Sequence, residues 1–104
     1  MNSIFAVCYS RGPNWVKGKS VFEQPLQAHL AYMKAPHAQG RLLLGGPFLN
    51  DEGGLVVVRV AGIDEANQIA SDDPAIRAGV MMTRAHPWKL LAGETMLTGS
   101  PAAV

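Results

Sequence analysis

His29 and Asp73 are the two residues whose types and positions suggest chemistry most directly. A histidine gains or loses a proton near neutral pH, which suits a general acid or base. His29 falls at the border of the apolar face of a predicted helix, so its imidazole is expected to point toward a sheet. The position also suits a half-buried histidine bonded to a backbone carbonyl, and spacing alone favours this structural role.

Asp73 stands beside Asp72 at the expected end of a second helix. Taken alone, a carboxylate there is best interpreted as a solvated turn residue. If both helices lie on the same face of a sheet, however, Asp73 comes near the first helix. A hydrogen bond from His29 to Asp73 would then fix the histidine tautomer and stabilise the protonated ring. Spacing leaves both interpretations open.

Three further residues are candidates for substrate binding, namely Gly46, Pro47 and His86. The paired glycines Gly45 and Gly46 would let a ligand or another backbone approach closely, although a bulge or a bend explains them equally well. His86 shares strand parity with Trp88, which places it either in the same pocket or on a dimer face.

The segment from Gly12 to Ser20 is similar to a phosphate-binding loop but does not fit one. Such a loop has four residues between its glycines, so that consecutive backbone N–H groups converge on the phosphates. Here five residues separate Gly12 from Gly18. They include Pro13, which has no N–H, and the bulky Trp15. We therefore interpret the segment as a basic surface loop.

Neither a metal site nor a cysteine nucleophile is indicated. The three histidines at positions 29, 37 and 86 form no i, i+4 pair and have no acidic cluster beside them, so we predict no metal and no cofactor. The single cysteine, Cys8, lies within an apolar strand, which predicts an inert thiol in the core.

A helix must position His29. It is expected to begin close to Pro25, because proline is tolerated only in a first turn. Pro36 is expected to kink or end it, and Gly40 suits the turn beyond. The residues predicted to form its apolar arc are Phe22, Leu26, Leu30, Met33 and His37.

Four strands and a second helix complete the pattern. The predicted strands are Ile4–Tyr9, Arg41–Phe48, Leu55–Val60 and Val80–Leu91, the last interrupted if His86-Pro87 breaks it. Residues 50–54 predict a hairpin turn between the second and third strands. Asp64 is the expected N-cap of a helix through Ala70, which Asp73-Pro74 closes. The order βαββαβ predicts an α+β, ferredoxin-like fold with both helices on one face of an antiparallel sheet.

Both faces of this sheet are predicted to be apolar. Val56, Val58 and Val60 point one way, whereas Leu55 and Val57 point the other. Two helices cover one face only, so the other needs a different cover. A second copy of the same sheet is the simplest one, and we therefore predict a homodimer with the sheets face to face.

Length and composition narrow the function classes. The 104 residues suffice for one domain, placed at 1–98, with 99–104 as a disordered tail. Apolar residues make up 48% of the chain and charged residues 16%, and the net charge is +1. This balance favours a folded core and argues against a nucleic-acid or acidic-membrane binder. With no secretory signal pattern and no membrane-spanning apolar run, we expect a soluble, cytoplasmic protein.

Together these segments resemble the YCII-related (YciI-like) family. The resemblance rests on His29-Leu30-Ala31-Tyr32-Met33, on the run from Gly40 to Pro47, and on Asp73-Pro74 followed by Ala78-Gly79-Val80. It implies a ferredoxin-like fold, two copies of which associate to form a dimeric α/β barrel. It also implies that a characteristic histidine and aspartate, suspected to be catalytic, correspond to His29 and Asp73. Many members carry basic residues before that histidine, whereas residues 22–27 here contain neither Arg nor Lys.

Two functions are consistent with these features. The first is a small cofactor-independent enzyme that uses His29 and Asp73 for acid–base chemistry, isomerase- or lyase-like, on a small organic substrate that is aromatic or lactone-like by analogy with the fold. The alternative is a non-catalytic module of the same fold that binds a small metabolite or a protein. A third possibility is that the pair only braces the two helices.

Overall fold

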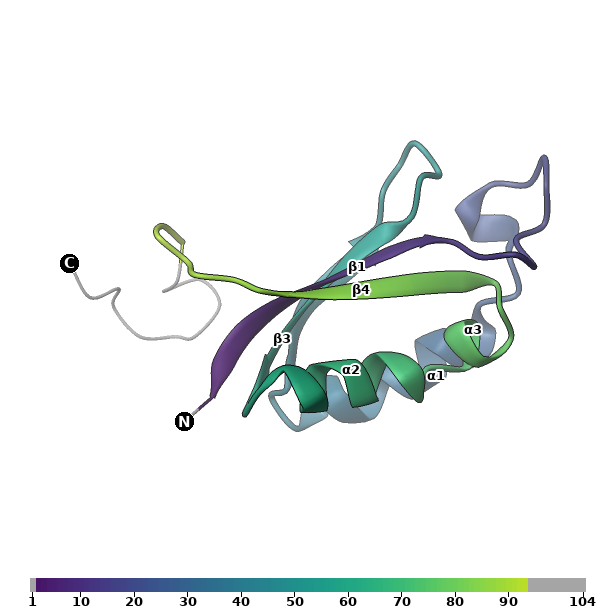
Figure 1. Cartoon of the computed structure of the whole chain (residues 1–104). Helices are drawn as coiled ribbons and strands as arrows, with labels where there is room; N and C mark the ends of the chain where they lie inside the picture. The colour runs from purple at the N-terminus through teal and green to yellow at the C-terminus, as the bar shows by residue number, and fades with distance from the viewer. Residues whose placement is uncertain (1, 94–104) are drawn as a thin grey trace.

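A computed structural model describes residues 2–93 and contains a four-stranded antiparallel sheet with helices on one face (Figure 1). The strands are β1 (Ser3–Arg11), β2 (Leu42–Pro47), β3 (Gly54–Val60) and β4 (Met81–Pro87), and the helices are η1 (Val21–Glu23, a 3-10 turn), α1 (Gln27–Ala38), α2 (Ile63–Ser71) and α3 (Pro74–Arg77). The sheet order is β2-β3-β1-β4. This is the predicted α+β, ferredoxin-like arrangement. No helix within residues 2–93 is both long and apolar enough to cross a bilayer.

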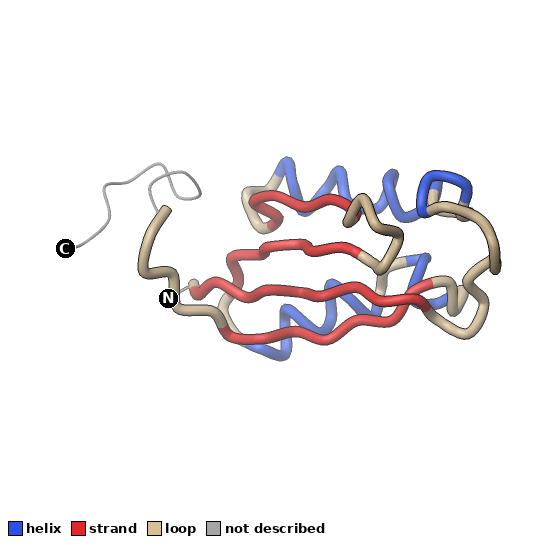
Figure 2. Tube along the Cα trace, turned by 90° about the horizontal axis from the view of Figure 1, so that it is seen from above, coloured by secondary structure: helices blue, strands red, loops and turns tan. Residues whose placement is uncertain are grey.

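The helix-covered face of the sheet forms the core. Phe5, Val7 and Tyr9 of β1 alternate inward, and Val56, Val58 and Val60 of β3 do the same; all six are buried. Figure 2 shows the four strands in one layer with the helices behind them. The alternation predicted for β3 therefore holds, and the inward parity of β1 places Tyr9 beneath the helices.

No helix of the described residues, 2–93, covers the opposite face of the sheet. Cys8 lies there and is exposed, so the prediction of a core thiol is wrong. The reason is parity, because Cys8 alternates with Val7 and Tyr9 and the helices cover only their side. Val57 also lies on this face, between Ala6 and Leu44 in the register, yet is buried.

The buried side of α1 differs from the predicted arc. Phe22 precedes the helix and is 74% exposed, Leu30 is 65% exposed, and His37 is also exposed. Pro36 is buried and Met33 packs against the core. The predicted arc included Phe22, which lies before the helix, so its centre was displaced around the helix axis from the side that is buried. His29, at the edge of the predicted arc, lies on the side that faces the fold.

Pro36 does not end α1, which continues to Ala38. The helix closes where Gly40 takes a positive φ of 73°, as its position beyond the helix suggested. The N–H of Gly40 donates to the carbonyl of His37 at 3.1 Å, and that of Arg41 donates to the carbonyl of Pro36 at 2.9 Å. Pro36 has no N–H to donate to the preceding turn, but its own carbonyl is paired with the N–H of Arg41.

Three other predicted boundaries shift. The N-cap of α2 is Gly62 and not Asp64, which sits in the first turn. Asp73 does not close α2; it caps the separate helix α3. The last strand ends at Pro87, where the sequence allowed an interruption, and not at Leu91, although the N–H of Trp88 still donates to the carbonyl of Ile4 at 2.9 Å. The predicted tail at 99–104 lies outside the described residues.

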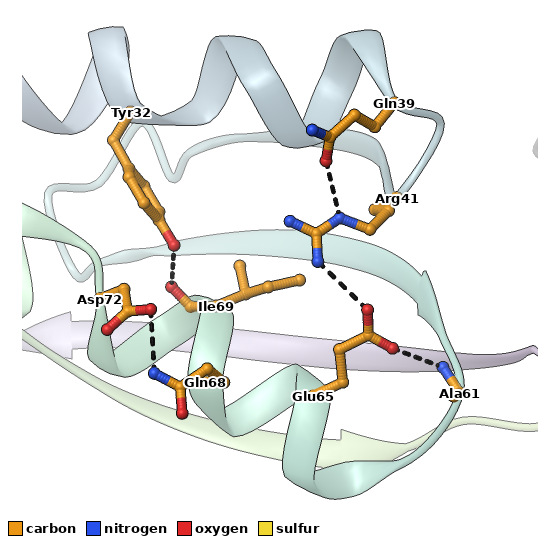
Figure 3. A network of polar contacts seen from close by, with 8 residues as sticks. All are labelled: Tyr32, Gln39, Arg41, Ala61, Glu65, Gln68, Ile69 and Asp72. Atoms are coloured by element: carbon orange, nitrogen blue, oxygen red, sulfur yellow. Dashed lines mark hydrogen bonds and ion pairs between the residues drawn. The ribbon is translucent and has the colours of Figure 1, made fainter.

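Polar contacts join α1 to α2 on the helical side of the fold (Figure 3). The hydroxyl of Tyr32 donates to the carbonyl of Ile69 at 2.9 Å. Arg41 Nη1 lies 3.1 Å from Glu65 Oε1, and Glu65 Oε2 accepts the N–H of Ala61 at 2.9 Å. The Ala61 N–H and then Arg41 lower the pKa of Glu65. These contacts fix where α1 lies over the sheet.

The hairpin between β2 and β3 depends on one glycine. Gly53 has a φ of 134°, and a Cβ built there would lie 1.9 Å from the carbonyl oxygen of Tyr9. We predict that Gly53→Ala lowers the free energy of unfolding by roughly 1–3 kcal/mol or more, through strain and the clash with β1. Denaturant unfolding measures this.

Gly46→Ala is the matched control on the same hairpin. A Cβ at Gly46 meets nothing within 4 Å, and this glycine has no positive φ. Its free energy of unfolding should stay within about 0.5 kcal/mol of the original. Equal stabilities for the two variants would contradict the assigned role of Gly53.

Candidate functional site

Asp73 is a fully buried carboxylate that caps α3. It precedes Pro74 and has extended backbone angles (φ −65°, ψ 126°), as expected for a residue before proline. Its Oδ1 accepts the N–H of Ala75 at 2.9 Å, and its side chain has 0% exposure. Burial of a carboxylate requires hydrogen-bond donors, and further donors reach its other oxygen.

His29 supplies one of these donors. Its Nδ1 lies 2.7 Å from Asp73 Oδ2, and its side chain is 18% exposed. An ionised carboxylate only accepts hydrogen bonds, so Nδ1 carries the hydrogen. In the neutral ring Nε2 is therefore left with a free lone pair, which is the arrangement a general base needs.

Tyr9 supplies the other donor. Its hydroxyl donates to the same oxygen, Asp73 Oδ2, at 2.7 Å. Its ring packs edge-on against His29, with ring centroids 5.6 Å apart. Burial, followed by the negative charge of Asp73, raises the pKa of the Tyr9 phenol. Sequence reasoning missed Tyr9; its inward parity with Phe5 and Val7 was the available signal, since a buried tyrosine hydroxyl needs a partner.

A cavity of about 360 Å³ adjoins this cluster. Its walls are mostly apolar and include Leu26, Leu30 and Met33 of the α1 region and Val56 of β3. Among its lining residues within 2–93, only His29 and Tyr9 have ionisable side chains, and none is Lys or Arg. A small organic molecule with an apolar body fits this combination of walls and a single imidazole.

Gly46 and Pro47 line the same cavity as His29, at the end of β2. Their neighbour Gly45 is packed more tightly, because a Cβ there would lie 3.0 Å from Cγ2 of Val56. The main chain of the glycine pair thus forms part of the cavity wall. The structure brings together four of the five candidate residues: His29 and Asp73 in contact, with Gly46 and Pro47 at the adjoining cavity.

His86 is the exception, and the prediction that it shares the pocket is wrong. It pairs with Ala6 in the sheet register and is exposed, and it does not line the cavity. Its neighbour Ala85 packs against the core, so alternation turns His86 to the helix-free face. The other predicted location, a dimer face, is consistent with this position.

At the end of β1, just before the basic loop, Arg11 contacts the hairpin, and none of residues 12–20 lines the cavity. The Arg11 guanidinium lies 5.2 Å from the Trp15 ring centroid, and its Nε donates to the carbonyl of Asp51 at 2.8 Å. Lys19 lies 3.8 Å from Glu23. The buried Gln24 amide holds the loop through both backbone groups of Val16. Within residues 2–93, no three His, Cys, Asp or Glu side chains gather around a common metal position.

The chain is similar to known proteins in sequence and in fold. It is 28% identical over 68 residues to the uncharacterised protein YjpA of Bacillus subtilis (strain 168), a stretch that covers 65% of this chain and 80% of YjpA. Its fold is similar to that of 5-chloro-2-hydroxyhydroquinone dehydrochlorinase (TftG) from Burkholderia phenoliruptrix AC1100, solved in complex with 2,5-dihydroxybenzoquinone. The TM-score is 0.60 and the identity 23%, over 83% of this chain and 93% of that one.

The identity to the solved structure supports a common fold and nothing finer. The relation to a family is stronger, because a family model extends from β1 past the end of β4. The model for the YCII-related domain matches residues 5–89, so the chain belongs to the YCII-related family.

Proposed function

We propose that the protein is a small acid–base enzyme of the isomerase or lyase type, acting without a cofactor on a small organic substrate in the cavity. The observation that carries this proposal is the 2.7 Å contact between His29 Nδ1 and Asp73 Oδ2 at the wall of an apolar cavity. His29 transfers the proton, and Asp73 orients the ring. The main chain at Gly46 and Pro47 contacts the substrate.

The geometry supports a simple sequence of proton transfers. His29 Nε2 takes a proton from a substrate C–H or O–H group, and the charge that develops on the ring is stabilised by the buried Asp73 carboxylate. In an isomerisation, the imidazolium returns the proton to another substrate atom. In an elimination, the electron pair left on the substrate expels a leaving group as an anion. A positioned group of this kind contributes about 10²- to 10⁴-fold in rate.

The structural neighbour gives a substrate class to try first. TftG is named for removing hydrogen chloride from a small hydroxylated ring, an elimination in which a proton and a chloride leave. This chain has an apolar cavity of about 360 Å³, which is large enough for a single ring. A hydroxylated, halogenated ring is therefore a suitable probe substrate.

A binding module is the second candidate, and one observation favours it. Among the cavity-lining residues of the described range 2–93, His29 is the only group free to exchange a proton, because the Tyr9 hydroxyl donates to Asp73. Reactions that need a separate acid and base in the cavity would have to use His29 for both steps. A module that only binds a ligand needs one hydrogen-bonding group and apolar walls, which the cavity supplies.

We also propose that a second copy covers the helix-free face of the sheet. Ile4, Ala6 and Val57 lie on this face, together with the exposed Cys8 and Met82. This face also carries His86 and Arg84, and its apolar part would be covered if another sheet packed against it. The partners of the protein are then a small molecule and its own second copy.

The acid–base role predicts the effect of removing the imidazole. His29→Ala should reduce chloride release from 5-chloro-2-hydroxyhydroquinone by about 10²- to 10⁴-fold, because no other cavity-lining side chain within residues 2–93 is placed to take up the proton. His37→Ala, an exposed histidine on the same helix, is the matched control and should leave the rate unchanged. Unchanged turnover in His29→Ala would overturn the catalytic role. Retention of 2,5-dihydroxybenzoquinone by the original chain, with no turnover, would favour the binding module.

The apolar cavity predicts the effect of its exposed wall residues. Phe22 lines the cavity and is 74% exposed in the free chain, so a ligand is expected to bury part of its ring. Phe22→Ser should weaken binding of 2,5-dihydroxybenzoquinone by about tenfold or more, with little change in stability. Calorimetric titration measures the affinity. Leu49→Ser is the control, since Leu49 is 86% exposed and lies outside the cavity wall; equal losses in both variants would contradict the proposed site.

The dimer predicts the effect of a charge on the helix-free face. The original chain should sediment as a dimer, and Cys8→Arg should sediment as a monomer, because it places a second cation beside Arg84 on the buried interface. Ala35→Arg, on the exposed surface of α1, should remain dimeric. A monomeric original chain in analytical ultracentrifugation would show that the proposed interface does not form.

A further inference from the structure

We infer that Tyr9 is a positioning residue that controls how strongly His29 holds a proton, acting through Asp73. The inference rests on the proposed acid–base role of His29, but it concerns a different residue and has its own observable. Tyr9 does not act on the substrate, since its hydroxyl is directed at the carboxylate.

The two donors compete for one oxygen. The Tyr9 hydroxyl and His29 Nδ1 both lie 2.7 Å from Asp73 Oδ2, whereas Oδ1 is occupied by the N–H of Ala75 at 2.9 Å. Hydrogen bonds that share an acceptor weaken one another, because each withdraws part of the same negative charge. The hydrogen bond from the Tyr9 hydroxyl therefore reduces the negative charge with which Asp73 stabilises a protonated His29.

The Tyr9 hydroxyl is a constant donor. Burial and the adjacent Asp73 carboxylate raise the pKa of its phenol, so Tyr9 keeps its hydrogen throughout the range in which a histidine titrates. Its edge-on contact with the His29 ring also limits rotation of that ring. Tyr9 thus holds the Asp73 carboxylate and the His29 ring in place while Nε2 of that ring gains or loses a proton.

The other charged groups near the pair are already engaged. The Asp72 carboxylate accepts from Arg77 at 2.9 Å and from Gln68 at 2.9 Å. Arg41, from the segment that follows α1, pairs with Glu65 of α2. The hydroxyl of Tyr32 donates to the backbone of α2. The group of β1 that faces His29 is Tyr9 itself. The cavity-lining side chains within residues 2–93 include no Asp, Glu, Lys or Arg.

Removal of the Tyr9 hydroxyl therefore has a defined sign. In Tyr9→Phe, Asp73 gives more of its charge to His29, which stabilises the protonated ring. The midpoint of the His29 titration, followed by NMR of the imidazole, should move to higher pH by about one pH unit. His37 and His86 are exposed and serve as internal references in the same spectra. Tyr32→Phe, which loses a hydroxyl that donates elsewhere, should leave the His29 midpoint in place.

A stronger donor at the same position must have the opposite effect. The chain contains two tyrosines, so Tyr32→Phe leaves Tyr9 as the single site for 3-fluorotyrosine. The fluorinated phenol is a stronger acid and a stronger donor, and it should move the His29 midpoint to lower pH. This measurement decides the matter if Tyr9→Phe fails to fold.

Opposite shifts for the two substitutions support the inference. An unchanged His29 midpoint, or a shift in the same direction for both, overturns it, because a purely packing role does not depend on donor strength. These outcomes are independent of turnover. Failure of the proposed catalytic role would instead appear as full activity in His29→Ala. It would not change the titration shifts expected for the two Tyr9 substitutions.

Discussion

A buried carboxylate that needs donors is the constraint on which this fold depends. Asp73 has no exposed surface, and an unpaired charge in that position would be strongly unfavourable. Three donors satisfy it, from Tyr9 on β1, His29 on α1 and Ala75 on α3. Because each comes from a different element, a shift of any one of them would leave the charge incompletely paired. The same contacts therefore stabilise the fold and define the site.

The rest of the structure positions those donors. Strand alternation turns Tyr9 inward with Phe5 and Val7, and Pro74 holds Asp73 in the extended conformation that caps α3. The bonds between α1 and α2 fix the first helix over the sheet, so that His29 faces the carboxylate while remaining at the cavity wall. Gly53 lets the hairpin approach β1 closely, which completes the far side of the cavity.

Much of this was accessible from the sequence, since alternation and turn composition are local. The hairpin turn, the two faces of β3 and the order of elements all follow from residues that are close in the chain. The rotation of α1 was not predictable from its apolar spacing, because Phe22 and Leu30 are exposed at a cavity whose walls come from distant segments. For the same reason Tyr9 was missed, since its partner lies 64 residues away. Strand parity left two locations open for His86, the pocket or a dimer face, because parity does not say which face the helices cover.

The different environments of Tyr9 and His29 favour the proposed base over a purely structural contact. Tyr9 alone already links β1 to the α3 cap with a donor that does not titrate near neutral pH. If the second contact to Asp73 were also only structural, another buried donor that does not titrate near neutral pH would suffice. His29 instead keeps 18% of its side chain exposed, lines the cavity, and has no Nε2 hydrogen bond to any residue in the range 2–93. A titratable ring held by one nitrogen, with the other free beside an apolar cavity, supports the proposed proton transfer more than a purely structural role.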